Sequence, residues 1–239
     1  MKKFTVLLLL SNILLFSNKS VAQNNTNDQK YIYKKGDYNG IGKWYMDREI
    51  AYVMGYEGIG WLERSEREKE ENVSKLIQNM GIKPNDTIAD IGAGSGYHVF
   101  RMAPIAKKGM VYAVDIQPEM LMAIENSKET SKIKNIETIL SSEKSVYLSK
   151  NSVDKILMVD VYHEFSFPIE MITSIKSALK PKGELFLIEY RAEDPNVPIK
   201  KIHKMSEKQA VKEMNAAGFK LKKNINNLPW QHCIIFVKK

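Results

Sequence analysis

The chain has 239 residues, of which 44% are hydrophobic and 27% are charged, and its formal net charge is +8. This length and composition favour one compact domain with a single core, and the lack of internal repeats and low-complexity tracts excludes a repeat protein. The charge excess falls to +5 without Lys2, Lys3 and Lys19, and no basic run is interleaved with aromatic residues, so we expect no nucleic-acid partner.

The first 22 residues have the pattern of a secretory signal peptide. Lys2 and Lys3 form a short positive region, residues 4–16 are predominantly apolar, and residues 20–22 read Ser-Val-Ala, the small residues that a signal peptidase requires. We expect cleavage after Ala22 and an exported protein, periplasmic or secreted. An uncleaved membrane anchor is the alternative, and no later apolar stretch is long enough to span a bilayer.

Residues 23–60 form a second segment. Residues 23–37 are rich in Asn, Gln, Asp and Lys, which predicts a disordered lead-in. The remainder, to residue 60, is dense in aromatic residues and glycines.

From residue 61 onward the sequence alternates between strand and helix patterns. Strands are expected at residues 87–91, 110–115, 136–140, 153–160, 184–189, 219–225 and 233–237. Helices are expected at residues 65–80, 97–106, from 118 onward, 167–179 and 206–218, with capping boxes that begin at Ser65 and Ser206. The last two strands are joined by a short link and should pair antiparallel. The pattern predicts an α/β fold with a Rossmann-like, seven-stranded, mostly parallel sheet, helices on both faces and an antiparallel last strand.

The first strand runs directly into a glycine turn. Gly92, Gly94 and Gly96 follow Asp90 at alternate positions, so the backbone can lie against a cofactor at the same crevice as the carboxylate. The dinucleotide fingerprint requires a small residue where this chain has Tyr97. The turn therefore favours a cofactor without phosphate that carries a nucleoside and an amino acid end, a description that S-adenosylmethionine (SAM) fits.

A second acid follows the second strand. Asp115 ends the strand and precedes Ile116, at the place in a βαβ unit where a carboxylate accepts both ribose hydroxyls. Together, the two motifs indicate a nucleoside cofactor more specifically than either alone.

These motifs resemble those of class I SAM-dependent methyltransferases. The resemblance is carried by residues 89–96 (Ala-Asp-Ile-Gly-Ala-Gly-Ser-Gly), 112–115 (Tyr-Ala-Val-Asp), 154–165 and 179–185, and it spans roughly residues 66–238. Residues 54–64 further resemble a bacterial subgroup that carries signal peptides and has no assigned substrate. The resemblance implies SAM as cofactor, methyl transfer as reaction and a methyltransferase domain over residues 61–239. It also implies that the aromatic segment before residue 61 either folds across the cofactor or only covers the sheet edge.

The expected site lies at the carboxyl ends of the strands, where the winding of the sheet reverses. The residues expected to bind the cofactor are Asp90, Gly92, Ala93, Gly94, Gly96, Asp115, Ile116, Ser142, Glu143 and Asp160. Ser142 and Glu143 would face the adenine amino group, and Asp160 the amino group of the methionine end.

The acceptor side is expected at Tyr162, His163 and Glu164, where the imidazole is the natural base for a hydroxyl acceptor and the carboxylate the second choice. His203 could enter from the opposite wall. Asp160, His163, Glu164 and His203 are also suitable metal ligands, but they lack a compact spacing such as H-E-x-x-H, so we expect no metal.

Three functions fit this site. The first is an exported SAM-dependent methyltransferase with a small-molecule or lipid-like acceptor. The second is a binding module that holds SAM or a nucleoside without turnover. The third, a nicotinamide-dependent oxidoreductase, is disfavoured by Tyr97.

Overall fold

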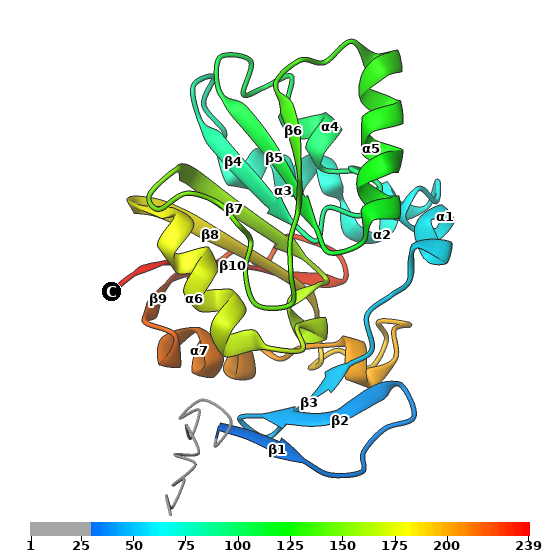
Figure 1. Ribbon diagram of the computed structural model, residues 1–239. Coiled ribbons are helices and arrows are strands. Elements are labelled where there is room, and N and C mark those ends of the chain that lie inside the picture. The colour runs from blue at the N-terminus through cyan, green and yellow to red at the C-terminus, as the bar shows by residue number, and fades with distance from the viewer. Residues whose placement is uncertain (1–29) are drawn as a thin grey trace, which may run out of the picture.

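The computed structural model describes residues 30–239, and its centre is a seven-stranded sheet in the order β6-β5-β4-β7-β8-β10-β9 (Figure 1). The strands are β4 (Thr87–Ile91), β5 (Met110–Asp115), β6 (Ile136–Leu140), β7 (Val153–Val159), β8 (Leu179–Tyr190), β9 (Phe219–Asn224) and β10 (Gln231–Lys238). Neighbouring strands from β6 to β8 are parallel, whereas β10 is antiparallel to both β8 and β9. The predicted Rossmann-like sheet with its reversed last strand is confirmed.

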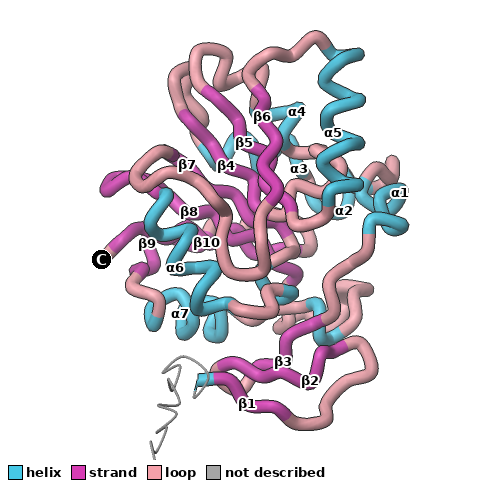
Figure 2. The backbone as a smooth tube through the Cα atoms, in the orientation of Figure 1, coloured by secondary structure: helices cyan, strands magenta, loops and turns pink. Residues whose placement is uncertain are grey.

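Helices cover both faces of this sheet (Figure 2). One layer contains α3 (Val73–Met80), α4 (Val99–Met102) and α5 (Pro118–Ser131), and the other contains α6 (Pro168–Ala178) and α7 (Glu207–Ala216). Successive strand residues point to opposite faces, so Ile88 packs in the first layer and Ala89 in the second. The inner strands are therefore buried on both sides, as expected for a parallel sheet, whereas the edge strands β6 and β9 are partly exposed.

The expected helix over residues 65–80 is broken in two. It consists of α2 (Arg67–Glu71) and α3, separated by Asn72 in the left-handed region at φ 52°. The capping box at Ser65 was wrong, because α2 begins after Glu66 without a side-chain cap, and Asn72 caps α3 by accepting from the Lys75 amide. Asparagine tolerates this backbone conformation and supplies a cap oxygen at the same time.

Other boundaries differ less. The Ser206 cap is confirmed, since its hydroxyl accepts from the Gln209 amide at 3.1 Å. β8 begins at Leu179 rather than residue 184, with a register shift against β7 that accommodates Pro181 to Gly183. Only Val99–Met102 is α-helical in the segment expected to be helical over residues 97–106.

An additional antiparallel sheet precedes the main domain. It is formed by β1 (Tyr31–Tyr33), β2 (Gly40–Tyr45) and β3 (Arg48–Ala51). The predicted disordered lead-in is therefore wrong for residues 30–37, because Tyr31 is buried against Phe167 at a ring distance of 6.2 Å. Residues 23–29 and the predicted signal peptide, residues 1–22, lie outside the described residues. Within residues 30–239, no helix combines the length and apolar character needed to cross a bilayer.

A buried ion pair joins the small sheet to the main domain. Arg48 in β3 binds both carboxylate oxygens of Glu213 in α7, at 2.8 and 2.9 Å. Arg48 also donates to the carbonyl of His163 at 3.1 Å, in the short 3₁₀ helix η3 (Tyr162–Glu164). The small sheet is thus held against the turn that follows β7, next to the candidate site.

Candidate active site

A cavity of about 490 Å³ lies at the carboxyl ends of β4, β5 and β7. The winding of the sheet reverses between β4 and β7, which is where open α/β sheets bind their ligands. The volume falls within the range typical of small-molecule sites. Its walls bring together the glycine turn, Asp115 and the residues that follow β6 and β7.

The glycine turn forms one wall of the cavity. Gly92 and Gly94 line it in the left-handed region, at φ 74° and 54°. A Cβ atom would lie 2.4 Å from the Val161 side chain at Gly92, and 2.7 Å from Leu62 at Gly94. The turn therefore requires glycine, both for its backbone conformation and for the close approach of its neighbours.

Asp115 braces this turn from the end of β5. Its Oδ2 accepts from the Gly94 amide and its Oδ1 from the Gln117 amide, both at 2.9 Å. Each carboxylate oxygen has a further lone pair, so Asp115 can accept hydroxyl donors from the cavity that it lines. Burial raises the pKa of Asp115, and the two backbone amides partly offset this rise.

The residues that follow β5 and β6 supply a second wall of the cavity. Ile116, Ser142 and Glu143 line the cavity, as predicted from their places after the strands. The Ser142 hydroxyl accepts from the Ser145 amide at 3.1 Å and so closes a tight turn, while the Glu143 carboxylate is exposed. These groups lie where a heterocycle with an amino group could find acceptors.

Asp160 lies after β7 in a strained conformation. Its φ is 49°, which is uncommon for a residue other than glycine and clusters at functional sites. Its Oδ2 accepts from the Gln231 amide group at 2.5 Å, whereas its Oδ1 is buried without a hydrogen-bond partner. Burial, together with the nearby Glu71 carboxylate, raises the pKa of Asp160 well above its usual range. A cationic amino group would donate a hydrogen bond to the unpartnered Oδ1 and would balance the negative charge of the ionised carboxylate.

Three predicted cofactor residues do not line the cavity. Asp90 is only 2% exposed and lies behind the glycine turn, where burial raises its pKa to about 8. Ala93 is buried in the helical layer, and a Cβ at Gly96 would meet Phe100 and Ile124. These residues shape the turn rather than contact the cavity, since only Ile91, Gly92 and Gly94 of residues 90–96 line it.

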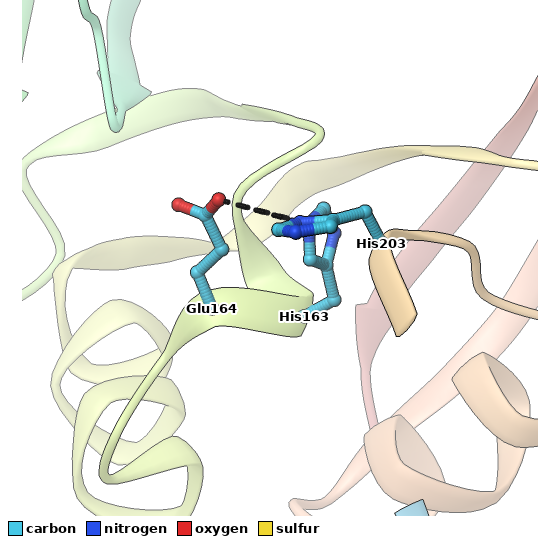
Figure 3. Close-up of side chains that lie close together, drawn as sticks. All are labelled: His163, Glu164 and His203. Atoms are coloured by element: carbon cyan, nitrogen blue, oxygen red, sulfur yellow. Dashed lines mark hydrogen bonds and ion pairs between the residues drawn. The ribbon is translucent and has the colours of Figure 1, made fainter. Parts of the chain in front are cut away.

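The cavity is also lined by a cluster of three side chains, His163, Glu164 and His203 (Figure 3). His163 Nε2 lies 3.1 Å from His203 Nδ1, and Glu164 Oε1 lies 3.8 and 3.7 Å from these two nitrogens. His203 comes from the 3₁₀ helix η4 (Lys201–His203), forty residues further along the chain. The predicted entry of His203 from the opposite wall matches this arrangement.

Glu189, which the sequence analysis did not select, orients the cluster. Its Oε2 accepts from His163 Nδ1 at 2.6 Å, and both side chains are buried. A sequence signal for Glu189 exists, since this carboxylate lies next to the carboxyl end of β8, the edge of the sheet where the other site residues lie.

The electrostatic environment shifts the pKa values of His163, Glu164 and His203 in different directions. Burial alone would lower the pKa of His163, but the Glu189 carboxylate outweighs it and the pKa is raised. Burial and the neighbouring His163 lower the pKa of His203 to about 4. Burial raises the pKa of Glu164 to about 7, a value suited to proton transfer near neutral pH.

Tyr162 lies apart from this cluster. It is 1% exposed, does not line the cavity, and donates its hydroxyl to Glu213 Oε2 at 2.7 Å. The structure thus places Tyr162 with the Arg48–Glu213 ion pair rather than with the acceptor, and we do not keep it among the catalytic candidates.

The segment before β4 covers the cavity. Val53, Met54, Trp61 and Leu62 line it, whereas the tyrosines of β1 to β3 do not. The Met54 amide donates to Glu164 Oε1 at 3.2 Å, and its carbonyl accepts from the Gln117 side chain at 3.0 Å. Of the two alternatives for the aromatic segment, residues 53–62 fold across the site, while the small sheet packs against other elements.

Comparisons with known proteins identify relatives of the chain. A family model described as a methyltransferase domain matches residues 82–231. A tRNA U34 carboxymethyltransferase of Desulfotalea psychrophila is 30% identical over 52% of this chain and 37% of its own length. A ubiquinone/menaquinone biosynthesis C-methyltransferase of Wigglesworthia glossinidia brevipalpis is 28% identical over 48% of this chain and 47% of its own length. The chain thus spans less than half the length of these curated relatives.

Among solved structures, a SAM-dependent methyltransferase from Aquifex aeolicus matches with a TM-score of 0.73. The match covers 77% of this chain and 98% of that chain, at 24% sequence identity. At this identity the likeness shows a common fold.

Proposed function

This chain belongs to the methyltransferase-domain family, whose cofactor is SAM, and on that premise we propose that it is an exported enzyme that methylates a small-molecule or lipid-like acceptor. The observation that carries the proposal is one cavity with two chemically distinct sets of lining residues. The first set is the glycine turn and Asp115, and the second is His163, Glu164 and His203. The part of the cavity beside the first set is called the cofactor end, and the part beside the second set the acceptor end. The nicotinamide alternative is set aside by the family match.

Two carboxylates at the cofactor end of the cavity are suited to SAM. Asp115 would accept the ribose hydroxyls, because its two oxygens have lone pairs beyond those used by backbone amides. Asp160 would accept the cationic amino group at its unpartnered Oδ1. When bound, SAM supplies a methyl group on a positively charged sulfur.

The residues at the other end prepare the acceptor. Methyl transfer depends on alignment of the acceptor atom with the methyl group in a pocket that excludes water. The main chain at Met54, which is bonded to Gln117 and Glu164, and the apolar walls provide such a pocket. For a hydroxyl acceptor, His163 Nε2 would take the proton, and Glu189 would stabilise the imidazolium through Nδ1. Glu164 Oε1 is the second proton acceptor.

The apolar part of the cavity walls favours an apolar acceptor. It includes Val53, Met54, Phe165, Met171, Pro198 and Ile199. The two relatives are named for different substrates, a tRNA and a quinone, and apolar walls support the second kind. The absence of a nucleic-acid partner stays a prediction.

Export is proposed from the sequence of residues 1–22, which has the pattern of a cleaved leader. Fractionation of the source cells should find the protein in the envelope or the medium, beginning at Gln23. An intact N-terminus in the cytosol would contradict export and leave the proposed chemistry untouched.

Methyl transfer is tested with SAM labelled on its methyl group. The protein is incubated with separate lipid, small-molecule and tRNA fractions, and label is expected in one of the first two. His163→Asn should abolish transfer, whereas His232→Asn, outside the cavity, should retain it. Label in tRNA would overturn the acceptor class, and SAM binding without transfer to any fraction would favour a binding module.

A further inference from the structure

We propose that His163, Glu164 and His203 bind one divalent transition-metal ion at the acceptor end of the cavity. The ligand atoms are His163 Nε2, His203 Nδ1 and Glu164 Oε1, which lie 3.1, 3.7 and 3.8 Å from one another (Figure 3). Two ligands bound to one Zn²⁺ at 2.0–2.1 Å and at the tetrahedral angle are about 3.3 Å apart. The three separations are within about 0.5 Å of this value, so small side-chain shifts suffice.

A second observation is the support behind the ligands. His163 donates from Nδ1 to the buried Glu189 carboxylate at 2.6 Å, which leaves Nε2 as the nitrogen that faces the cluster. Histidines that ligate metals almost always donate their other ring N–H to a carboxylate, a carbonyl or water in this way. Glu164 is held similarly, since its Oε1 accepts from the Met54 amide at 3.2 Å.

The types of ligand atom select the class of ion. Two imidazoles and one carboxylate suit Zn²⁺, Co²⁺, Fe²⁺ or Mn²⁺, whereas Mg²⁺ and Ca²⁺ prefer oxygen ligands alone. Three protein ligands leave at least one coordination position open, as in catalytic zinc sites. All three side chains line the cavity, so the open position faces the space for the acceptor.

This site rests on the proposed function and extends it, and it is proposed in place of the expectation of no metal. That expectation depended on spacing along the chain, whereas the fold brings η4 against η3. A bound ion would lower the pKa of an acceptor hydroxyl and so activate the acceptor. His163 would then not act as the base, because its Nε2 would be bound to the ion. Among residues 30–239, His163, Glu164 and His203 are the only group of three side chains close enough to share an ion.

Metal binding can be measured without methyl transfer. The untagged full chain, treated with a chelator and dialysed, is titrated with Co²⁺ while the visible absorption of the bound ion is recorded, and Zn²⁺ is then added as a competitor. We expect one equivalent of Co²⁺ to bind and Zn²⁺ to displace it, with no displacement by Mg²⁺ at the same concentration.

Variants locate the ion. His203→Ala and Glu164→Gln should each weaken Co²⁺ binding at least tenfold, and Glu189→Gln should weaken it by about 10- to 100-fold through loss of positioning. His232→Gln is the matched control, since His232 also pairs with a carboxylate, Glu193, at 2.9 Å but has no third ligand. Thermal unfolding without metal confirms that each variant is folded; the His203 side chain is 24% exposed and tolerates truncation.

Each outcome bears on the metal site alone. Absence of a Co²⁺ spectrum, or equal binding by the parent, His203→Ala and Glu164→Gln, would overturn it. Loss of binding in His232→Gln as well would also overturn it, because the ion would then lie elsewhere. Methyl transfer by a protein that binds no metal would leave the proposed function standing, and metal binding without methyl transfer would leave the ion site standing.

Discussion

The role of Asp115 can be tested by Asp115→Ala. In the structure both carboxylate oxygens already accept a backbone amide at 2.9 Å, one from Gly94 and one from Gln117. Two ribose hydroxyls would therefore add two charge-assisted hydrogen bonds, each of which contributes about 1.5 to 3 kcal/mol in favourable cases. Water replaces part of this interaction in the variant, so the net loss of binding free energy should be about 1 to 3 kcal/mol. The dissociation constant should therefore rise roughly 5- to 150-fold.

The assay is titration calorimetry with SAM and with its demethylated product. Both ligands should lose affinity to the same extent, because they share the ribose. Glu119→Ala, which removes an exposed carboxylate in the first turn of α5, is the control and should bind as the parent does. An unchanged dissociation constant for Asp115→Ala, in a protein shown to be folded by its thermal transition, would refute the ribose assignment.

Three further predictions concern stability and the glycine turn. Asp90→Asn should stabilise the ligand-free protein by about 1 to 3 kcal/mol at pH 7. The native pKa of Asp90 is raised to about 8, so the folded state retains a proton that the unfolded state releases, and the stability of the parent relative to the variant should fall from about pH 4 to pH 8. Urea unfolding at several pH values measures this difference, and a constant difference would contradict it. Glu213→Ala should lower the free energy of unfolding by about 3 to 5 kcal/mol, since it leaves the buried Arg48 unpaired, and a loss below about 1 kcal/mol in urea would count against the buried pair. Gly94→Val should abolish SAM binding by calorimetry, because its side chain would collide with Leu62 and strain the turn, and parental affinity would show that the turn is not in contact with the cofactor.

The central sheet could be predicted because local and global signals coincide there. The strands that became β4, β5 and β6 were located to the residue, since each is a short apolar run bounded by turn residues. The break at Asn72 was missed, because a left-handed residue inside a helical pattern has no periodicity signal. β1 was missed because it has only three residues, and its stability comes from contacts with distant elements such as Phe167.

Part of the site could also be predicted from local sequence signals. Residues that directly follow a strand, such as Asp115 and Asp160, could be placed from the general rule for parallel sheets. The sequence does not reveal which residues near a strand end face the cavity, so Asp90 and Tyr162 were assigned to the site although both are buried and neither lines the cavity. His203 is forty residues from His163, and only folding shows how closely the two rings approach.

The main chain at Met54 has a thermodynamic consequence for the two ligands. One peptide segment is tied to Gln117 on the cofactor side and to Glu164 on the acceptor side. A ligand in either half of the cavity that reduces the motion of this segment also orders the segment where it covers the other half. The two affinities are then linked, and linkage requires that each ligand tighten the other by the same factor. Such reciprocity would keep the cofactor in place until an acceptor has arrived and reacted.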